Sequence, residues 1–309
     1  MTNRSLAGAS VVVTGGGTGI GAACARKAAD EGARVTICGR TQSKLDATAD
    51  GIRAAGGEVS TVVADVTVED DVIRLMASAI SFGNGLDGVV ANAGGGGGIA
   101  PYHLQDVNEF VRVLNLNVVS TLLCIKHAVP HLARSGGGSF VAMSSIAGHV
   151  THRYFGAYPV GKAGIESMVR NAADEYGHAG VRFNALQPGF ITTEVMEGIE
   201  RGGPVWNSYV EQTPLGGVGT PEDVANVARF LLSAESRWIT GQTLAVEIHF
   251  FRVEVVMRVV ARQTTDARIL RVIALAAGQS IRLEPNIRNP RVRLRSNFRP
   301  GAVALPTKL

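Results

Sequence analysis

The chain has 309 residues, of which 46% are hydrophobic, and its formal net charge is +4. This length and apolar fraction suit one large α/β domain with a sizeable core. The three cysteines (Cys24, Cys38, Cys124) are odd in number and widely spaced, which excludes a disulfide framework and a zinc knuckle. The chain begins without a signal-peptide pattern, and no apolar run reaches the roughly 20 residues that span a bilayer. We therefore expect a cytoplasmic protein with no membrane partner.

The positive charge is concentrated at the end of the chain. Residues 247–309 contain 11 Arg and one Lys against four acids, a net charge of +8. Residues 1–246 therefore keep 18 basic and 22 acidic residues, a net charge of −4. A mildly acidic body argues against nucleic acid as its partner. The two parts need separate explanations.

Apolar runs alternate with helical segments through the first half of the chain. The β-branched run "SVVVT" (10–14) predicts a buried parallel strand, and further strands are expected at 33–38, 58–66, 86–94 and 138–145. Helices are expected between them, at about 42–56, 68–83 and 105–134. This alternation predicts one α/β domain with a doubly wound parallel sheet and helices on both faces. Ligands on such sheets bind at the carboxyl ends of the strands.

A glycine-rich loop, "GGGTGIG" (15–21), follows the first strand and opens a helix-forming segment. Glycines let the backbone turn tightly and approach a pyrophosphate, whose charge is stabilised at a helix N-terminus. A tight turn without a ligand is the alternative. We predict a dinucleotide site here, and its contacts are expected at Gly15, Gly17, Thr18, Gly19, Ile20 and Gly21.

The end of the second strand indicates which dinucleotide binds. NAD-binding folds usually carry an acid there that accepts the ribose 2′-hydroxyl, whereas this chain has Gly39 and Arg40. An arginine can bind a 2′-phosphate, so NADP(H) is the preferred cofactor and NAD(H) the alternative. A solvated Arg40 without a ligand would look the same in sequence.

Tyr158 and Lys162, in "YPVGK", lie four residues apart, so a helix would place them on one face. A neighbouring fixed cation lowers a tyrosine pKa toward the range of acid–base catalysis. An ordinary surface pair has the same spacing. His127 and His131 have metal-ligand spacing, but Pro130 separates them and no third ligand is apparent. We expect two helix-surface histidines there and no metal.

Taken together, these motifs resemble the short-chain dehydrogenase/reductase family over roughly residues 5–246. The resemblance rests on motifs in the family's order: "TGGGTGIG" (14–21), Asp65, "NAG" (92–94), Asn117, Ser145, "YPVGK" (158–162), "NALQPGFITT" (184–193) and "TGQTLAV" (240–246). It implies a Rossmann-type fold in which Tyr158 exchanges a proton with the substrate oxygen. Lys162 would lower the tyrosine pKa and hold the nicotinamide ribose. Ser145 would orient the carbonyl or alcohol, and Asn117 would anchor the water of a proton relay.

The resemblance also implies further cofactor contacts and the class of reaction. The additional contacts are expected at Asp65, Val66, Asn92, Ala93, Gly94, Pro188, Gly189, Ile191 and Thr193. The reaction would interconvert a ketone and a secondary alcohol in a homodimer or homotetramer. The whole pattern is most similar to 3-oxoacyl-thioester (acyl-carrier-protein) reductases, with a hydroxysteroid or xenobiotic carbonyl reductase as the alternative. The apolar segment 193–214 suits a lid over an apolar or acyl small-molecule substrate.

An alternative of another class is an NADP(H)-binding regulator without turnover. The intact set Ser145, Tyr158 and Lys162 argues against it, because binding alone needs no proton donor.

Residues 247–309 depart abruptly from the family pattern, where an Asp-Gly-Gly turn normally follows "LAV". Their arginine- and proline-rich composition is typical of irregular structure. We interpret them as a frame-shifted read appended to a catalytic domain at 1–246. The alternative is a genuine extension whose apolar run at 250–260 pairs with the sheet edge and whose arginines bind an anionic partner. Limited proteolysis that leaves a stable body ending near Val246 would favour the first interpretation.

Overall fold

The computed structural model describes residues 5–196, 198–247, 280–282 and 293–295. The chain divides into two compact units, Met1–Ile248 and His249–Leu309. The strands of the first unit are β1 (Ser10–Thr14), β2 (Arg34–Gly39), β3 (Glu58–Val63), β4 (Gly88–Ala91), β5 (Gly138–Met143), β6 (Val181–Pro188) and β7 (Thr243–Val246). Its α-helices are α1 (Gly19–Asp30), α2 (Gln42–Ala54), α3 (Glu69–Gly83), α4 (Val107–Leu114), α5 (Ser120–Arg134), α6 (Ala157–Tyr176), α7 (Pro204–Gln212) and α8 (Pro221–Leu232).

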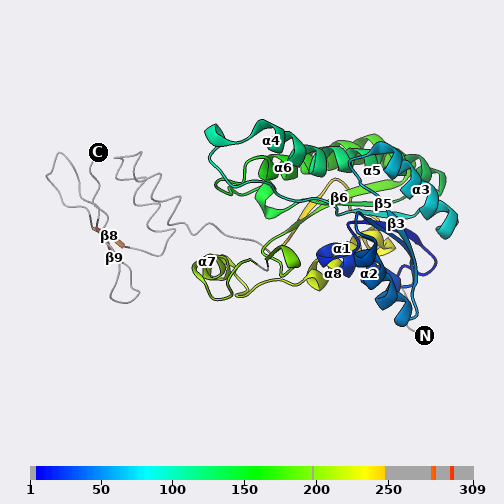
Figure 1. Cartoon of the computed structure of the whole chain (residues 1–309), viewed down its shortest axis with the longest axis horizontal. Coiled ribbons are helices and arrows are strands. Elements are labelled where there is room, and N and C mark those ends of the chain that lie inside the picture. The colour runs from blue at the N-terminus through cyan, green and yellow to red at the C-terminus, as the bar shows by residue number, and fades with distance from the viewer. Residues whose placement is uncertain (1–4, 197, 248–279, 283–292, 296–309) are drawn as a thin grey trace. The chain divides into compact units, whose positions relative to one another are not determined.

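The first unit is built on a parallel sheet with the order β3-β2-β1-β4-β5-β6-β7. Helices α3 to α6 cover one face, and α1, α2 and α8 cover the other (Figure 1). This arrangement confirms the predicted doubly wound α/β fold. The strand order reverses between β1 and β4, which is where such sheets bind ligands.

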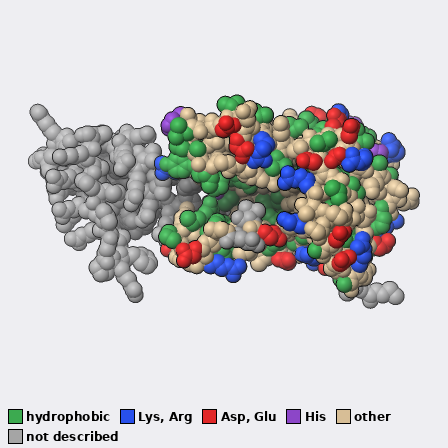
Figure 2. All heavy atoms as spheres, viewed as in Figure 1, with side chains coloured by type: hydrophobic (Ala, Val, Ile, Leu, Met, Phe, Trp, Pro, Cys, Tyr) green, Lys and Arg blue, Asp and Glu red, His purple; other side chains and the backbone are tan. Residues whose placement is uncertain are grey.

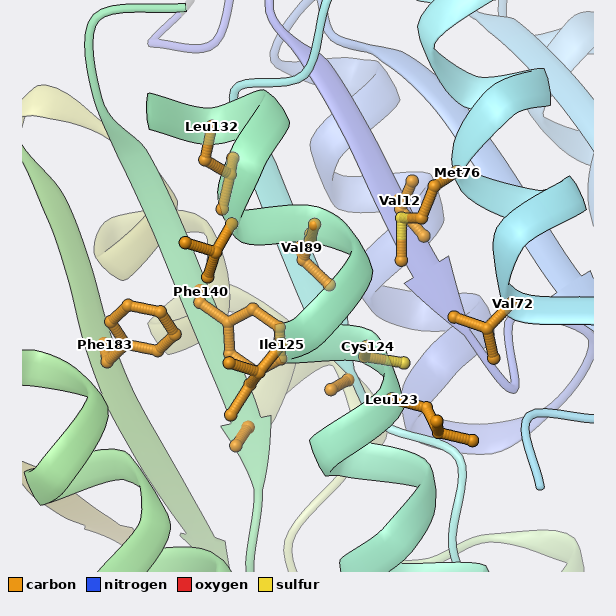
Figure 3. Close-up of a cluster of buried hydrophobic side chains, with 14 of the residues drawn as sticks. Val12, Val72, Met76, Val89, Leu123, Cys124, Ile125, Leu132, Phe140 and Phe183 are labelled. Carbon is orange, nitrogen blue, oxygen red and sulfur yellow. The ribbon is translucent and has the colours of Figure 1, made fainter. Parts of the chain in front are cut away.

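A hydrophobic core lies on each face of the sheet. On the face covered by α3, α5 and α6, Phe140 and Phe183 stack with ring centroids 5.3 Å apart (Figure 3). The central strands are buried on both faces, and all five residues of β1 are inaccessible or nearly so. Burial on both faces explains why the centre of β1, Val11–Val13, is a continuous apolar and β-branched run instead of alternating with polar residues.

The long helix expected at 105–134 is interrupted by a π-helical turn. The turn covers Asn115–Val119 and separates α4 from α5. The Asn117 side chain is fully buried there, and its Nδ2 donates hydrogen bonds to the Val113 and Gly95 carbonyls at 2.8 Å each. Single π-turns of this kind commonly occur at functional sites. By length and composition the described stretch Val107–Arg134 could cross a membrane, but half of its most apolar window is buried inside the protein, as in a core helix.

The two histidines of α5 contact charged neighbours. His127 Nε2 lies 2.8 Å from Glu69 Oε1, and His131 Nδ1 lies 3.1 Å from Arg134. Among the described residues, no group of His, Cys, Asp and Glu could hold a metal ion.

Glu247 belongs to the first unit, although it is the first residue after the predicted catalytic domain 1–246. Its carboxylate accepts hydrogen bonds from the Phe190 N–H at 2.5 Å and from Thr213 Oγ1 at 2.7 Å. In the second unit, β8 (Ser280–Arg282) pairs antiparallel with β9 (Arg293–Arg295). The apolar run 250–260, which the extension hypothesis invokes, lies outside the described residues.

Candidate functional site

A cleft of about 900 Å³ opens at the carboxyl ends of the strands. In Figure 2 this face is hollowed between the layer that carries α4 and α6 and the segment that carries α7. Of the predicted site residues, all but Asn117 line the cleft: Gly15, Gly17, Thr18, Gly19, Ile20, Gly21, Arg40, Asp65, Val66, Asn92, Ala93, Gly94, Ser145, Tyr158, Lys162, Pro188, Gly189, Ile191 and Thr193. Asn117 lies behind the cleft wall.

The glycine loop requires glycine for two separate reasons. Gly15 has a φ of +65°, a left-handed conformation that L side chains rarely adopt. At Gly21 a Cβ would lie 2.2 Å from the Gly15 carbonyl oxygen, so α1 can approach β1 this closely only without a side chain. The first turn of α1 thereby lies on the cleft wall, and the N-terminus of a helix is a geometry that binds phosphate.

Thr14 and Asn92 hold the ends of β1 and β4 together at the switch point. Thr14 Oγ1 accepts hydrogen bonds from the N–H groups of Asn92 and Ala93, at 3.0 and 2.9 Å. Asn92 Nδ2 donates to the Thr14 carbonyl at 2.9 Å. Asn92 therefore supports the cofactor edge through its side chain, and Thr14, the first residue of the glycine motif, is a support residue to which the sequence assigned no role.

Two cations lie together at the far end of the glycine loop. Arg40 follows β2, Lys44 lies in the first turn of α2, and both are exposed and line the cleft. Gly17 packs against Lys44, since a Cβ on Gly17 would lie 3.2 Å from the Lys44 Cβ. The cleft that contains the predicted 2′-phosphate position at Arg40 is thus lined by a second cation, Lys44.

Tyr158 and Ser145 approach each other across the catalytic end of the cleft. The Tyr158 hydroxyl hydrogen-bonds with Ser145, which lowers the tyrosine pKa, but burial outweighs this and raises the pKa of Tyr158 above its usual value. The result corrects the expectation that Lys162 lowers this pKa. The Lys162 ammonium lies 5.5 Å from the Tyr158 ring centroid and donates instead to the Met143 carbonyl at 2.7 Å.

Lys162 is buried among groups that leave little room around its ammonium. It is 4% exposed, and burial lowers its pKa to about 8. A Cβ on Gly94 would meet Lys162 Nζ at 3.2 Å and Asn117 Oδ1 at 2.7 Å. Lys162 and Asn117 therefore converge on the backbone of Gly94. This convergence is compatible with the predicted relay, and the water in it stays a prediction.

An aromatic wall, formed by Phe190 and Tyr209, lines the cleft near Tyr158, and Trp206 packs against it. Phe190 and Tyr209 stack with centroids 4.1 Å apart and planes 5° apart, and Trp206 meets Phe190 edge-on at 5.6 Å. Burial and the nearby Glu247 carboxylate raise the pKa of Tyr209. Met196 and Ile199 add apolar lining from the segment that was expected to form a lid.

Sequence reasoning missed two carboxylates at this site. Glu194 Oε1 accepts a hydrogen bond at 3.3 Å from the N–H of Gly19, the first residue of α1. Glu166 is buried beneath Ser145 and accepts hydrogen bonds from Ser144 and Gln187. Glu166 could have been found by periodicity, because it follows Tyr158 and Lys162 at the same four-residue interval. No sequence signal indicates Glu194, whose contact joins segments 175 residues apart.

The described residues suit a nicotinamide dinucleotide along the whole cleft. The Gly15 and Gly21 geometry admits a diphosphate, Arg40 and Lys44 supply positive charge at one end, and the Tyr158 hydroxyl lies at the other. A proton donor beside Ser145 and Lys162 is the arrangement that stabilises an oxyanion formed from a carbonyl.

Comparisons with known proteins agree with this geometry. A family model described as enoyl-(acyl carrier protein) reductase matches residues 15–248. Cis-4-hydroxycyclohexanecarboxylate dehydrogenase of Sinomonas cyclohexanicum is 38% identical over 76% of this chain and 94% of its own length. Dehydrogenase/reductase SDR family member 4 of Oryctolagus cuniculus is 33% identical over 78% of this chain and 93% of its own length.

A solved structure of similar fold is a 7α-hydroxysteroid dehydrogenase complexed with NADH and 7-oxo glycochenodeoxycholic acid. It has a TM-score of 0.76 and 30% identity, and the match covers 80% of this chain and 97% of that one. The strand order, the cleft and these relatives lead to one assignment: this chain belongs to the short-chain dehydrogenase/reductase family, whose members are NAD(P)(H)-binding oxidoreductases that act on CH–OH groups.

Proposed function

We propose that the protein interconverts a secondary alcohol and a ketone on an apolar ring substrate, with NADP(H) as its preferred cofactor. The observation that carries this proposal is the convergence of Ser145, Tyr158 and Lys162 on one end of a cleft whose other end has the geometry of a dinucleotide site. A nicotinamide bound there would supply or accept the hydride. The Tyr158 hydroxyl gives its proton to the substrate oxygen in reduction and takes one back in oxidation.

Ser145 and Lys162 have the two other roles in the proposed reaction. The Ser145 hydroxyl orients the substrate oxygen and stabilises the charge that develops on it. Lys162 holds the ribose and, with Asn117, returns protons to Tyr158. The raised pKa of Tyr158 keeps its phenol protonated at neutral pH, which favours reduction, and oxidation should accelerate as the pH rises.

The substrate class follows from the wall of the cleft. Flat aromatic faces at Phe190 and Tyr209, with Met196 and Ile199 beside them, suit a compact apolar ring. Relatives of this chain are named for a hydroxycyclohexanecarboxylate and for a 7α-hydroxysteroid. The acyl-thioester reductase expected from the sequence has no counterpart among these names, although the family model carries an acyl-carrier description.

A substrate panel tests the proposal directly. NADPH oxidation is followed by absorbance with substituted cyclohexanones, a 7-oxosteroid and a 3-oxoacyl thioester. We expect the ring ketones to give the highest kcat/KM. Turnover of the thioester alone would support the 3-oxoacyl-thioester reductase predicted from the sequence. Failure of every carbonyl compound to react would favour the non-catalytic regulator.

Arg40→Ala should reduce the preference for NADP(H) over NAD(H) by about 10- to 150-fold, because a hydrogen bond to a charged group contributes roughly 1.5–3 kcal/mol. Cofactor dissociation constants from fluorescence titration give the ratio. Arg53→Ala is the matched control, since Arg53 is an exposed arginine on the neighbouring helix α2, does not line the cleft and pairs with Asp50. Equal affinity of the wild-type protein for both cofactors would remove Arg40 from phosphate binding.

Glu194→Gln should tighten the binding of both cofactors by about 2- to 5-fold. The Glu194 carboxylate lies on the Gly19 N–H, where a cofactor phosphate is expected, and a charge at a helix terminus contributes about 0.3–1 kcal/mol. NADPH titration of Glu194→Gln is compared with Glu222→Gln, an exposed carboxylate in the first turn of α8. Weaker or unchanged binding in Glu194→Gln would contradict this competition.

We also propose a homodimer or homotetramer, because the family usually pairs its long helices. Val107, Val111 and Leu122 on α4 and α5 are 74%, 47% and 48% exposed, a surface that pairing would bury. Sedimentation velocity at micromolar concentration tests this, and a monomer would refute it.

A further inference from the structure

Glu166 is a buried carboxylate directly beneath the catalytic residues. It is 8% exposed and lies on α6 one turn after Lys162 and two turns after Tyr158. Burying a carboxylate is costly unless donors surround it, so its hydrogen-bond partners must be well placed. Those partners are Ser144, the residue after β5, and Gln187 in β6.

One oxygen of Glu166 joins the ends of β5 and β6 to the catalytic helix. Ser144 Oγ and Gln187 Nε2 both donate to Glu166 Oε1, each at 2.7 Å. Ser144 Oγ also lies 3.1 Å from the Lys162 carbonyl oxygen, and the Ser144 N–H donates to the Leu186 carbonyl at 2.7 Å. Three elements that carry the site therefore meet at a single carboxylate.

The residues that contact Glu166 directly precede functional ones. Ser144 is followed by Ser145, and Gln187 is followed by Pro188 and Gly189 at the cofactor edge. The short 3-10 turn Ile146–Gly148 closes over the same oxygen, since a Cβ on Gly148 would lie 2.6 Å from Glu166 Oε1. This packing leaves the carboxylate few alternative positions.

We propose that Glu166 is a positioning residue that holds Ser145 in register with Tyr158 through its hydrogen bond to Ser144. The proposal rests on the carbonyl–alcohol reaction proposed above and adds a residue that touches neither substrate nor cofactor. The Ser145 hydroxyl acts on an oxygen that Tyr158 also contacts, so a shift of β5 relative to α6 separates two groups that must act together. A misplacement of about 1 Å can reduce a rate by about 10²-fold.

The kinetic test compares Glu166→Leu with Glu166→Gln. Leu removes the acceptor, whereas the Gln carbonyl oxygen can still accept both hydrogen bonds. We expect kcat to fall by about 10- to 100-fold in Glu166→Leu and to remain within about threefold in Glu166→Gln, with the NADPH dissociation constant unchanged in both. Glu175→Leu, an exposed position on the same helix, is the control for the substitution.

A double-mutant cycle distinguishes positioning from a general structural role. If Glu166 acts through Ser145, Glu166→Leu should change kcat less than about twofold in a Ser145→Ala background. Full additivity of the two losses would overturn the proposal. If Glu166→Leu does not fold, Ser144→Ala replaces it in the cycle, since it removes the same link and leaves Gln187 bonded to Glu166.

A readout without substrate separates this proposal from the proposed reaction. In protein labelled with ¹³Cζ-tyrosine, the Tyr158 signal, assigned from Tyr158→Phe, reports the hydrogen bond to Ser145. We expect it to move in Glu166→Leu in the direction that it moves in Ser145→Ala, and to stay in place in Glu166→Gln. An unmoved signal in a folded Glu166→Leu protein would overturn the positioning role even if the enzyme uses another substrate.

Discussion

Tyr158→Phe is expected to reduce kcat by at least about 10²- to 10⁴-fold while leaving the NADPH dissociation constant nearly unchanged. The substitution removes only the hydroxyl, so the cleft keeps its shape. The fall in kcat then measures the contribution of a general acid. Ser145 and Lys162 would still bind the substrate oxygen and the ribose. Steady-state kinetics together with cofactor titration measure both quantities.

The control for this substitution is Tyr176→Phe on the same helix. The Tyr176 ring packs against Phe183 with centroids 5.9 Å apart, far along α6 from the cleft, so its loss of a hydroxyl should leave kcat unchanged. Substantial turnover in Tyr158→Phe would show that another group delivers the proton. A large rise in the NADPH dissociation constant would instead assign Tyr158 mainly to cofactor binding.

Local sequence predicted most of this architecture because the strands of a doubly wound sheet are buried on both faces. Their apolar, β-branched character does not depend on the details of tertiary contacts, and "SVVVT" matches β1 residue for residue. The positions at which the strands end are less constrained by this burial. The third strand ends at Val63 instead of Val66, and Asp65 then lies in the following loop, where its Oδ1 accepts from Thr67.

The π-turn at Asn115–Val119 shows what local sequence could not indicate. "NLNVVS" has an ordinary helical pattern, and the extra residue in the turn is stabilised by the contact of Asn117 with Gly95, 22 residues away. For the same reason, local sequence could not predict the hydrogen bonds and pKa shifts of the site residues. The spacing of Tyr158 and Lys162 predicts a shared helix face, but only the fold shows that Lys162 donates to Met143 and that burial raises the tyrosine pKa.

Lys162→Met is expected to make the folded protein more stable at pH 7 while it reduces kcat/KM by about 10- to 150-fold, the loss of a charge-assisted contact. Burial lowers the pKa of Lys162 from 10.5 to about 8. Below pH 8 both the folded and the unfolded chain hold the proton, so folding carries the full cost of burying the charge, about 3 kcal/mol. Losing the charge-assisted hydrogen bond to Met143 offsets about 1.5–3 kcal/mol of the gain, so the net stabilisation is smaller than the burial cost alone.

The same linkage predicts how this difference depends on pH. Between about pH 8 and 10.5 only the unfolded chain holds the proton, so the wild-type protein gains stability as the pH rises, whereas Lys162→Met does not. Thermal melts at pH 7 should place Lys162→Met a few degrees above the wild type, and melts at pH 9.5 should bring the two closer together. Lys27→Met, on α1 and paired with Glu31 at 3.7 Å, should show no such convergence. A constant difference at both pH values would mean that Lys162 keeps its proton when buried and that the ammonium is stabilised more strongly than the single contact with Met143 provides.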